Sequence, residues 1–324
     1  TVKGVRAQSA AYADVTLTTT GTVTVGTGGI GSSTQIGDVS IDGTSIVLTG
    51  DITTAGTGSG ADIVGDIDFD GAVTIDGAVV LTTDTGGSTT NDGKIDFSTT
   101  IVGDNSSDDG AADSLTLVSG SGTITLGGTI GVANNAHLDA LSINATSSPS
   151  ALTIPQIGTG TAIGTAGVKG ATSIGNAASS SVTFSAASYK FATGQTTVTS
   201  AGDIVTAADT KIFSDANIKL DPGTGSLKFT GAFAITATTA NDTVEIAGNS
   251  LAVDSGSAST ETFTITAGAS SGTSGGTITI DGTIGGTAQL TAVDLKAATA
   301  INLGGNITTN GLSNVTVTGP AVLT

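Results

Sequence analysis

The residues best suited to binding a ligand are acidic and lie in one short segment, Asp66-Ile-Asp-Phe-Asp-Gly71. Alternate carboxylates followed by a turning glycine match the opening of a calcium-binding loop, because Ca²⁺ prefers several oxygen ligands. The glutamate expected at the twelfth position of such a loop is absent, since Gly77 stands there. The same alternation is typical of a strand with its apolar residues inward and its carboxylates outward. Asp66, Asp68 and Asp70 are therefore candidate calcium ligands on a segment that also reads as a strand.

A second acidic segment, Asp104-Asn-Ser-Ser-Asp-Asp-Gly110, is followed closely by Asp113. Asp104, Asp108 and Asp109 are candidate ligands for Ca²⁺, and a plain solvated turn is the alternative interpretation. Ca²⁺ is the one cofactor that the sequence points to. The Gly-Gly-x-Gly-x-Asp nonapeptide of calcium-dependent β-rolls does not recur along the chain.

Catalytic residues are scarce. The single histidine, His137, lies in a turn-like segment and is expected to be a surface residue rather than a base. A carbohydrate-cleaving groove combines carboxylates with basic and aromatic side chains, but the only arginine is Arg6 and tryptophan is absent. We therefore expect that the protein is not an enzyme.

The composition excludes further classes. The chain of 324 residues has no cysteine, so it has neither disulfides nor Cys-ligated metals. Its net charge of -18, with only 9 Lys and Arg, argues against a nucleic-acid-binding surface. No apolar run is long enough to span a membrane. The absence of both Cys and Met fits a protein of the cell exterior.

Short stretches in which apolar residues alternate with threonine or serine recur along the chain and predict β-strands. Examples are Thr22-Val-Thr-Val25, Ser114-Leu-Thr-Leu117 and Phe263-Thr-Ile265. The strands are separated by Gly-Thr, Asp-Gly, Gly-Gly and Asn-Gly pairs, which suit tight turns. We predict an all-β protein.

Internal repeats indicate which kind of β protein this is. Gly122-Thr-Ile-Thr-Leu-Gly-Gly-Thr-Ile-Gly131 returns as Gly276-Thr-Ile-Thr-Ile-Asp-Gly-Thr-Ile-Gly285, and Gly65-Asp-Ile-Asp-Phe69 resembles Gly93-Lys-Ile-Asp-Phe97. Such self-similarity predicts a right-handed parallel β-solenoid, a stack of coils each too small to be stable alone. With roughly 20–25 residues per coil and coils about 4.8 Å apart, the rod would be on the order of 60–80 Å long. Tandem β-sandwiches are the alternative, although they need more bulky aromatics.

At this point the repeats resemble those of large bacterial surface proteins, the filamentous-haemagglutinin-like β-strand-repeat exoproteins. The similarity is one of repeat style and covers about 14–148 and 241–324, in segments such as 93–103, 113–130 and 300–311. It implies a right-handed β-helix and a role as a secreted adhesin that binds host or surface glycans. The rhythm around 65–81 is also similar to that of phage tail fibres.

The composition divides the chain into three parts: acidic repeats over 1–148, a divergent part over 149–240, and further repeats over 241–324. The middle part contains five of the eight lysines and six of the ten aromatic residues, including Phe184, Tyr189 and Phe191. It is interpreted either as solenoid with a fatter core or a covering loop, or as an interaction face. Aromatic residues on an exposed loop there would favour glycan binding.

The two ends of the chain lack an amphipathic capping helix, and both Ala13–Leu17 and Asn314–Leu323 look like strands. Uncapped solenoid ends expose backbone hydrogen-bonding groups that the next subunit could cover. We therefore expect an extracellular structural protein of a prokaryote, a homopolymer joined head to tail through its terminal strands. The alternatives are a segment of a large adhesin and a viral fibre, which would be a trimer.

Overall fold

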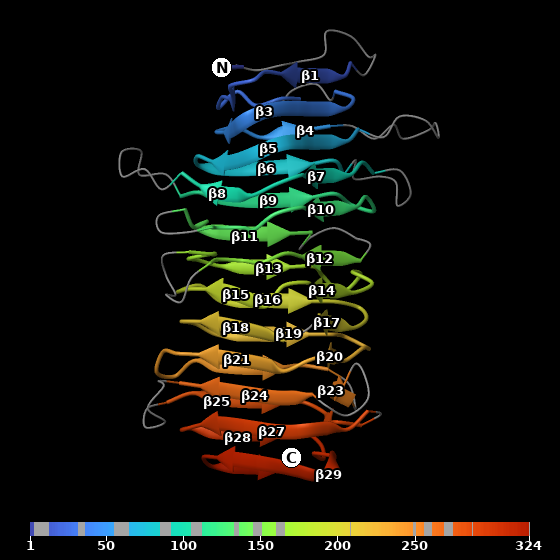
Figure 1. Cartoon of the computed structure of the whole chain (residues 1–324), viewed down its shortest axis with the longest axis vertical. Helices are drawn as coiled ribbons and strands as arrows, with labels where there is room; N and C mark the ends of the chain where they lie inside the picture. Colours follow the sequence, from blue (N-terminus) through green and yellow to red (C-terminus); the bar gives the residue numbers. More distant parts are fainter. Residues whose placement is uncertain are drawn as a thin grey trace.

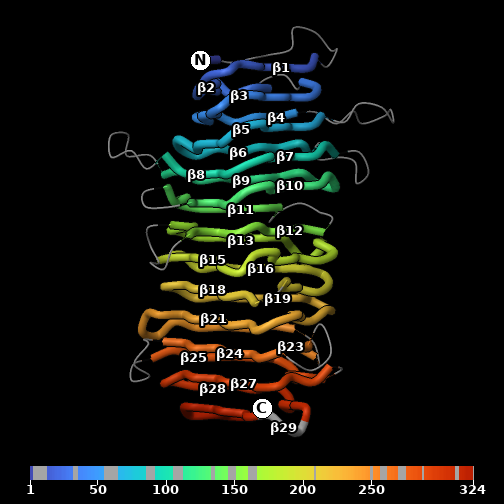
Figure 2. The backbone as a smooth tube through the Cα atoms, in the orientation of Figure 1, coloured from blue at the N-terminus to red at the C-terminus, as the bar shows by residue number. Residues whose placement is uncertain are grey.

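In the computed structural model the protein is a rod of stacked coils, and the N- and C-termini of the chain lie at opposite ends of the stack (Figures 1 and 2). The structure describes residues 1–2, 13–31, 36–54, 65–84, 92–104, 112–132, 136–144, 151–159, 166–207, 209–248, 251–255, 261–268, 275–286 and 288–323. All the regular structure in these residues is β-strand, and all strand pairs are parallel. The predicted parallel β-solenoid is confirmed, and the strands do not form tandem β-sandwiches.

Each coil runs through three faces. The first face contains β1 (Val15–Thr18), the start of β3 (Val39–Leu48), the start of β5 (Ile67–Ile75), β7 (Ile95–Phe97), β10 (Ile124–Leu126), β12 (Leu152–Ile154), β14 (Val182–Phe184), β17 (Ile204–Thr206), β20 (Leu227–Phe229), β23 (Leu251–Ser255) and β26 (Thr283–Ile284). The strands β3 and β5 are long because each bends around a corner onto the second face.

The second face begins with β2 (Thr22–Val25), the ends of β3 and β5, and β8 (Ile101–Gly103). Isolated bridges through Ile130 and Ile157 connect it to β15 (Ser188–Phe191). It continues with β18 (Thr210–Ser214), β21 (Phe233–Ala237), β24 (Thr262–Ala267), β27 (Leu290–Ala297) and β29 (Thr309–Thr318).

The third face is one sheet of 11 strands. It consists of β4 (Ile52–Thr53), β6 (Ala78–Thr82), β9 (Ser114–Val118), β11 (Ala140–Ile143), β13 (Thr172–Ile174), β16 (Thr196–Thr199), β19 (Ile218–Asp221), β22 (Thr243–Ile246), β25 (Thr277–Ile280), β28 (Ala300–Leu303) and β30 (Ala321–Leu323).

Coil length varies more than the sequence predicts. Ladder partners on the third face are 20 residues apart between Ile301 and Ala321, but 36 apart between Val79 and Leu115. The expected coil of about 20–25 residues is therefore too short for part of the chain. Insertions at the corners lengthen a coil without disturbing the ladders, because each strand pairs only with its neighbours in the stack.

The core is a narrow column of inward-pointing aliphatic and aromatic side chains. Along β5 the burial alternates, so that Ile67 and Phe69 are buried whereas Asp68 between them is only half-buried. Equivalent residues of successive coils stack directly, as Phe69 does on Phe97 with ring centroids 4.8 Å apart. This stacking converts a two-residue alternation in the sequence into continuous apolar ladders.

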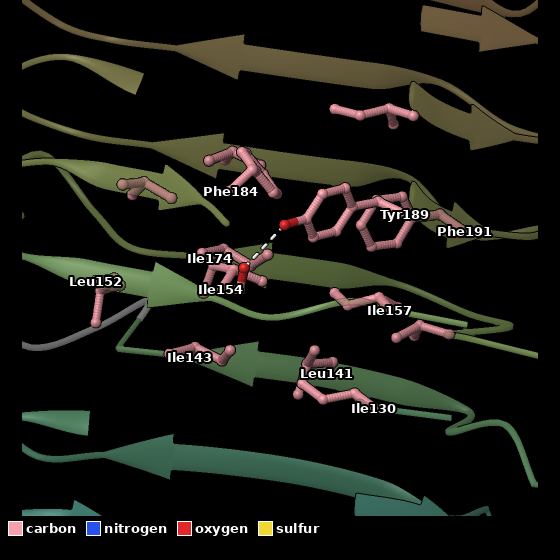
Figure 3. Close-up of a cluster of buried hydrophobic side chains, with 14 of the residues drawn as sticks. Ile130, Leu141, Ile143, Leu152, Ile154, Ile157, Ile174, Phe184, Tyr189 and Phe191 are labelled. Carbon is pink, nitrogen blue, oxygen red and sulfur yellow. Dashed lines mark hydrogen bonds between the residues drawn. The ribbon is translucent and has the colours of Figure 1, made fainter. Parts of the chain in front are cut away.

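The middle of the chain continues the same sheets with a more aromatic core. Phe184, Tyr189 and Phe191 are fully buried (Figure 3), and Phe229 and Phe233 stack with Phe263. The Tyr189 hydroxyl donates a hydrogen bond to the Ile154 carbonyl oxygen at 2.9 Å, and burial raises the pKa of this phenol to about 12. Five of the six aromatic residues in this part are buried, and the sixth, Phe213, is half-buried. The interpretation as solenoid with a fatter core fits, and an aromatic glycan platform on an exposed loop does not.

Candidate functional site

The segment Asp66–Gly71 forms a strand rather than a loop, because β5 begins at Ile67. Asp66 stands at the corner just before this strand, where it belongs to a series of carboxylates that join coils. The Asp38 N–H donates to Asp14 Oδ1 at 3.0 Å, the Asp66 N–H to Asp38 Oδ1 at 2.9 Å, and the Lys94 N–H to Asp66 Oδ1 at 2.9 Å. Each carboxylate thus fastens the backbone of the following coil.

Charge in this series is partly compensated. Lys94 Nζ donates to Asp68 Oδ1 at 2.8 Å and lies 4.0 Å from Asp66 Oδ2. Burial raises the pKa of the Asp66 carboxyl, and the backbone and charge of Lys94 offset this only in part. The hydrogen bond to Asp68 raises the pKa of the Lys94 ammonium, so the lysine stays charged.

The third candidate ligand, Asp70, is exposed and lies in register with Asp42 of the preceding coil. Its Oδ1 accepts a hydrogen bond of 3.1 Å from the Ser98 hydroxyl of the following coil. The three aspartates therefore lie at the corner before β5 and on the outward side of β5, and each accepts hydrogen bonds from a different donor. Within the described ranges, no group of three or more carboxylate and imidazole side chains is arranged to hold a metal ion.

The second candidate calcium segment is described at one residue only. Asp104 follows β8, and its N–H donates to the Ile75 carbonyl oxygen at 2.8 Å, which continues the ladder of the second face. Asp108 and Asp109 lie outside the described residues. Calcium binding by either segment stays a prediction.

His137 is placed at the corner before the third face, in a small charged group. Its Nε2 and Lys169 Nζ each lie 3.7 Å from Asp139 Oδ1. Asp139 Oδ2 accepts the Asp113 N–H at 3.0 Å, and Asp113 Oδ1 accepts the Gly77 N–H at 3.0 Å. Burial lowers the pKa of His137, whose side chain is 11% exposed. The expectation of a surface histidine is therefore wrong, and the group acts as another connection between coils.

Two lysines of the middle part also form ion pairs across coils. Lys219 Nζ lies 2.8 Å from Glu245 Oε1, and Lys228 Nζ lies 2.7 Å from Asp203 Oδ2. Each of these partly exposed ion pairs contributes little to the stability of the fold. They do neutralise lysines whose charge would otherwise attract an acidic partner.

A groove that the sequence does not predict lies on the outside of the first coils. It has a volume of about 920 Å³ and is lined by residues 18–20, 42–44, 70–72 and 99–100, the same corner in four successive coils. The corner is where β3 and β5 bend, and the ladder between them contains an irregularity between Asp42 and Ser45. The sequence feature that indicates this groove is the Asp-Gly pair at 42–43, which recurs one coil later at 70–71.

The last coil exposes residues that are buried everywhere else in the stack. Val315 and Val317 of β29 are 45% and 36% exposed, whereas their ladder partners Val293 and Leu295 are at most 1% exposed. Leu323 of β30 is 68% exposed, although its ladder partner Leu303 is only 8% exposed. Val322, which is 51% exposed, lies in register with the outward Asn302 and therefore faces the side of the rod. Within the described residues, the inward ladders are therefore uncovered on the far side of this coil.

Comparisons with known proteins give no family: no family model, no curated protein and no solved structure matches the chain. The described residues contain no helix long and apolar enough to cross a membrane. The fold defines the chain as a parallel β-solenoid repeat protein.

Proposed function

We propose that this protein is an extracellular structural rod of a prokaryotic cell surface, a subunit that extends into a filament or matrix by stacking coil upon coil. The observation that carries the proposal is the open last coil. Large exposed apolar side chains of the described residues are confined to this coil, with the single exception of Val80 on the third face.

The sides and the end of the rod differ in chemistry. The sides present half-buried polar residues and carboxylates, and they have few apolar groups that would drive lateral contact. The end presents unpaired strand edges beside exposed valines and leucine, a combination that favours pairing with another parallel strand. A second copy that presents its first coil would continue the same parallel ladders, and such a heterologous contact propagates without closing.

The mechanical properties follow from the coil. Most internal strands pair with a neighbour on each side, although the first face is interrupted between β10 and β12, and the aliphatic ladders exclude water along the axis. We further propose that Ca²⁺ neutralises the outward carboxylates of β5, because the ladders place Asp70 beside Asp42 and Asp68 beside Asp96, about 5 Å apart. Calcium binding by Asp104, Asp108 and Asp109 is proposed from the sequence alone.

Electron microscopy and analytical ultracentrifugation of the purified chain at high concentration, with and without Ca²⁺, test the proposal. We expect filaments with a regular axial repeat. The variant Val317→Lys should lose them because it places a charge at an inward position of the end contact, whereas Val80→Lys, which adds the same charge on a side face, should assemble normally.

Other outcomes overturn the proposal in identifiable ways. A chain that stays monomeric as short single rods indicates that further coils of the same polypeptide cover this end, as in a segment of a large adhesin. A discrete trimer indicates a viral fibre. Filaments that form equally well with Val317→Lys indicate that the end contact is not the joint.

A further inference from the structure

The groove at the corner of the first four coils is a structural feature for which the proposed rod function has no use. Its floor is bare backbone at Gly71, whose φ is 148° and whose missing Cβ would overlap the Gly43 carbonyl oxygen. The floor therefore cannot carry side chains without disrupting the stack. Bulges and bends of this kind re-aim the flanking side chains, which here leaves a channel that crosses several coils.

The lining of the groove consists of six threonines, two aspartates, two glycines and Ala72, so methyl groups make up most of its surface and hydroxyls and carboxylates supply its polar groups. Asp42 and Asp70 are the charged residues in its lining, one directly above the other and both exposed. Asp70 Oδ1 already accepts the Ser98 hydroxyl, and the Thr44 hydroxyl donates to the Gly21 carbonyl oxygen at 3.1 Å. A ligand that donates hydrogen bonds is needed to use the remaining carboxylate oxygens.

Charge limits the ligand further. The segment from Asp38 to Asp113 contains fifteen aspartates and only Lys94 as a basic residue. A sulfated or carboxylated polymer would be repelled from this part of the rod, so the ligand must be neutral or cationic.

The strand pairing separates a glycan from a peptide. β3 pairs with β1 and β2 on one side and with β5 on the other, and β5 pairs with β3, β7 and β8. The parts of the floor on β3 and β5 therefore offer no free strand edge to which a peptide backbone could add, and β1, which pairs only with β3 among the described residues, contributes only Thr18 to the lining. A linear glycan recognises side-chain acceptors through its hydroxyls and needs no such edge.

We propose that this groove binds an uncharged linear glycan along the axis of the rod, with Asp42 and Asp70 accepting hydrogen bonds from hydroxyls of successive sugar rings. Binding by one rod is weak, in the millimolar range, because no aromatic side chain lines the groove to stack on a sugar. If the rods assemble as proposed, many equivalent grooves act together and raise the avidity.

Binding is measured on the unassembled chain, so that the test does not depend on filament formation. The probes are neutral linear hexasaccharides of glucose and of N-acetylglucosamine, a uronic acid hexasaccharide and an oligolysine peptide, each followed by titration calorimetry. We expect a neutral hexasaccharide to bind. The double variant Asp42→Asn/Asp70→Asn, which changes the acceptors and keeps the shape, should weaken it by about tenfold.

Two further variants control for chemistry and for shape. Asp281→Asn removes an exposed carboxylate from another Asp-Gly corner and should bind like the parent chain. Ala72→Tyr fills the groove and should abolish binding, with the circular dichroism spectrum checking that the fold is kept. No binding by either neutral glycan, binding insensitive to the groove variants, or binding of oligolysine alone would each overturn the proposal.

Discussion

At the scale of single residues, the aspartates of this protein act chiefly as connections between coils. Asp38, Asp66 and Asp113 each accept a backbone N–H from an adjacent coil. A carboxylate at a corner satisfies a donor that the strand ladders leave unpaired, which explains why an outward, solvated residue type recurs at the corners. The calcium-loop pattern at 66–71 arises because this corner role and strand alternation coincide in one segment.

At Asp66 the cost of burying a charge can be distinguished from the benefit of the hydrogen bond that its side chain accepts. Because burial raises its folded-state pKa, the protonated Asp66 carboxyl contributes to stability most fully below pH 3.8, and this contribution is lost as the group ionises while pH rises through the raised pKa. Asp66→Asn keeps an oxygen for the Lys94 N–H and cannot ionise. We expect its unfolding free energy to exceed that of the parent by about 0.5 kcal/mol at pH 7 and to match it near pH 3.5.

Denaturant titrations at both pH values measure the difference, and Asp66→Ala is the matched control. The alanine removes the acceptor and should cost about 1 kcal/mol at either pH. A pH-independent gain for the asparagine variant would show that burial of the charge is not its cause.

At the scale of elements, the sequence predicts strands well and corners poorly. Alternation placed Ile67 and Phe69 inward correctly, and the similar segments Gly65–Phe69 and Gly93–Phe97 are indeed neighbours in the stack. The longer repeat is different: Ile124 lies in β10 on the first face, whereas its counterpart Ile278 lies in β25 on the third. Such a repeat records a strand–corner–strand unit that suits any face, so it does not give the coil length.

For the candidate sites, too, the sequence predicts the strands but not the corners. Spacing in the sequence could identify acidic strands, but not which carboxylates face a neighbouring N–H, because that depends on coil length. The groove was hidden for the same reason: 42–43 and 70–71 become neighbours only when the interval between them is one complete coil.

Two inward threonines offer a test of the core ladders. Thr172 of β13 and Thr196 of β16 are ladder partners, each 1% exposed, and their hydroxyls have no hydrogen-bond partner. Replacing both by valine removes two unsatisfied polar groups at similar size. We expect each substitution to stabilise the protein by about 1 kcal/mol.

Thermal and denaturant unfolding measure the gain. Thr210→Val is the matched control, because the buried Thr210 hydroxyl lies 3.2 Å from both the Ala186 and Ala207 carbonyl oxygens and its loss should destabilise. If all three valines have the same effect, hydroxyl pairing does not decide stability in this core.

At the scale of the whole molecule, the solenoid is close to one-dimensional: each coil touches the coils above and below it, and stability is approximately a sum of coil and interface terms. This predicts that a complete coil can be removed. Deleting residues 204–226 takes out β17, β18 and β19, one strand from each face, and brings β20 next to β14.

The new contacts after that deletion remain apolar. Phe229 would meet Phe184 on the first face, Ile235 would meet Tyr189 on the second, and Ile246 would meet Val198 on the third, each in the position of the residue removed. We expect a folded rod with an unchanged β spectrum in circular dichroism and a cooperative unfolding transition at somewhat lower denaturant.

Removing 204–214 alone is the informative comparison, because it deletes β17 and β18 but keeps β19. Every later strand would then be displaced from its face, and the inward ladders would no longer align. We expect this shorter deletion to aggregate or unfold although it removes fewer residues. If both deletions behave alike, the coil is not the unit of stability, and the stacking contact proposed for the end of the rod loses its physical basis.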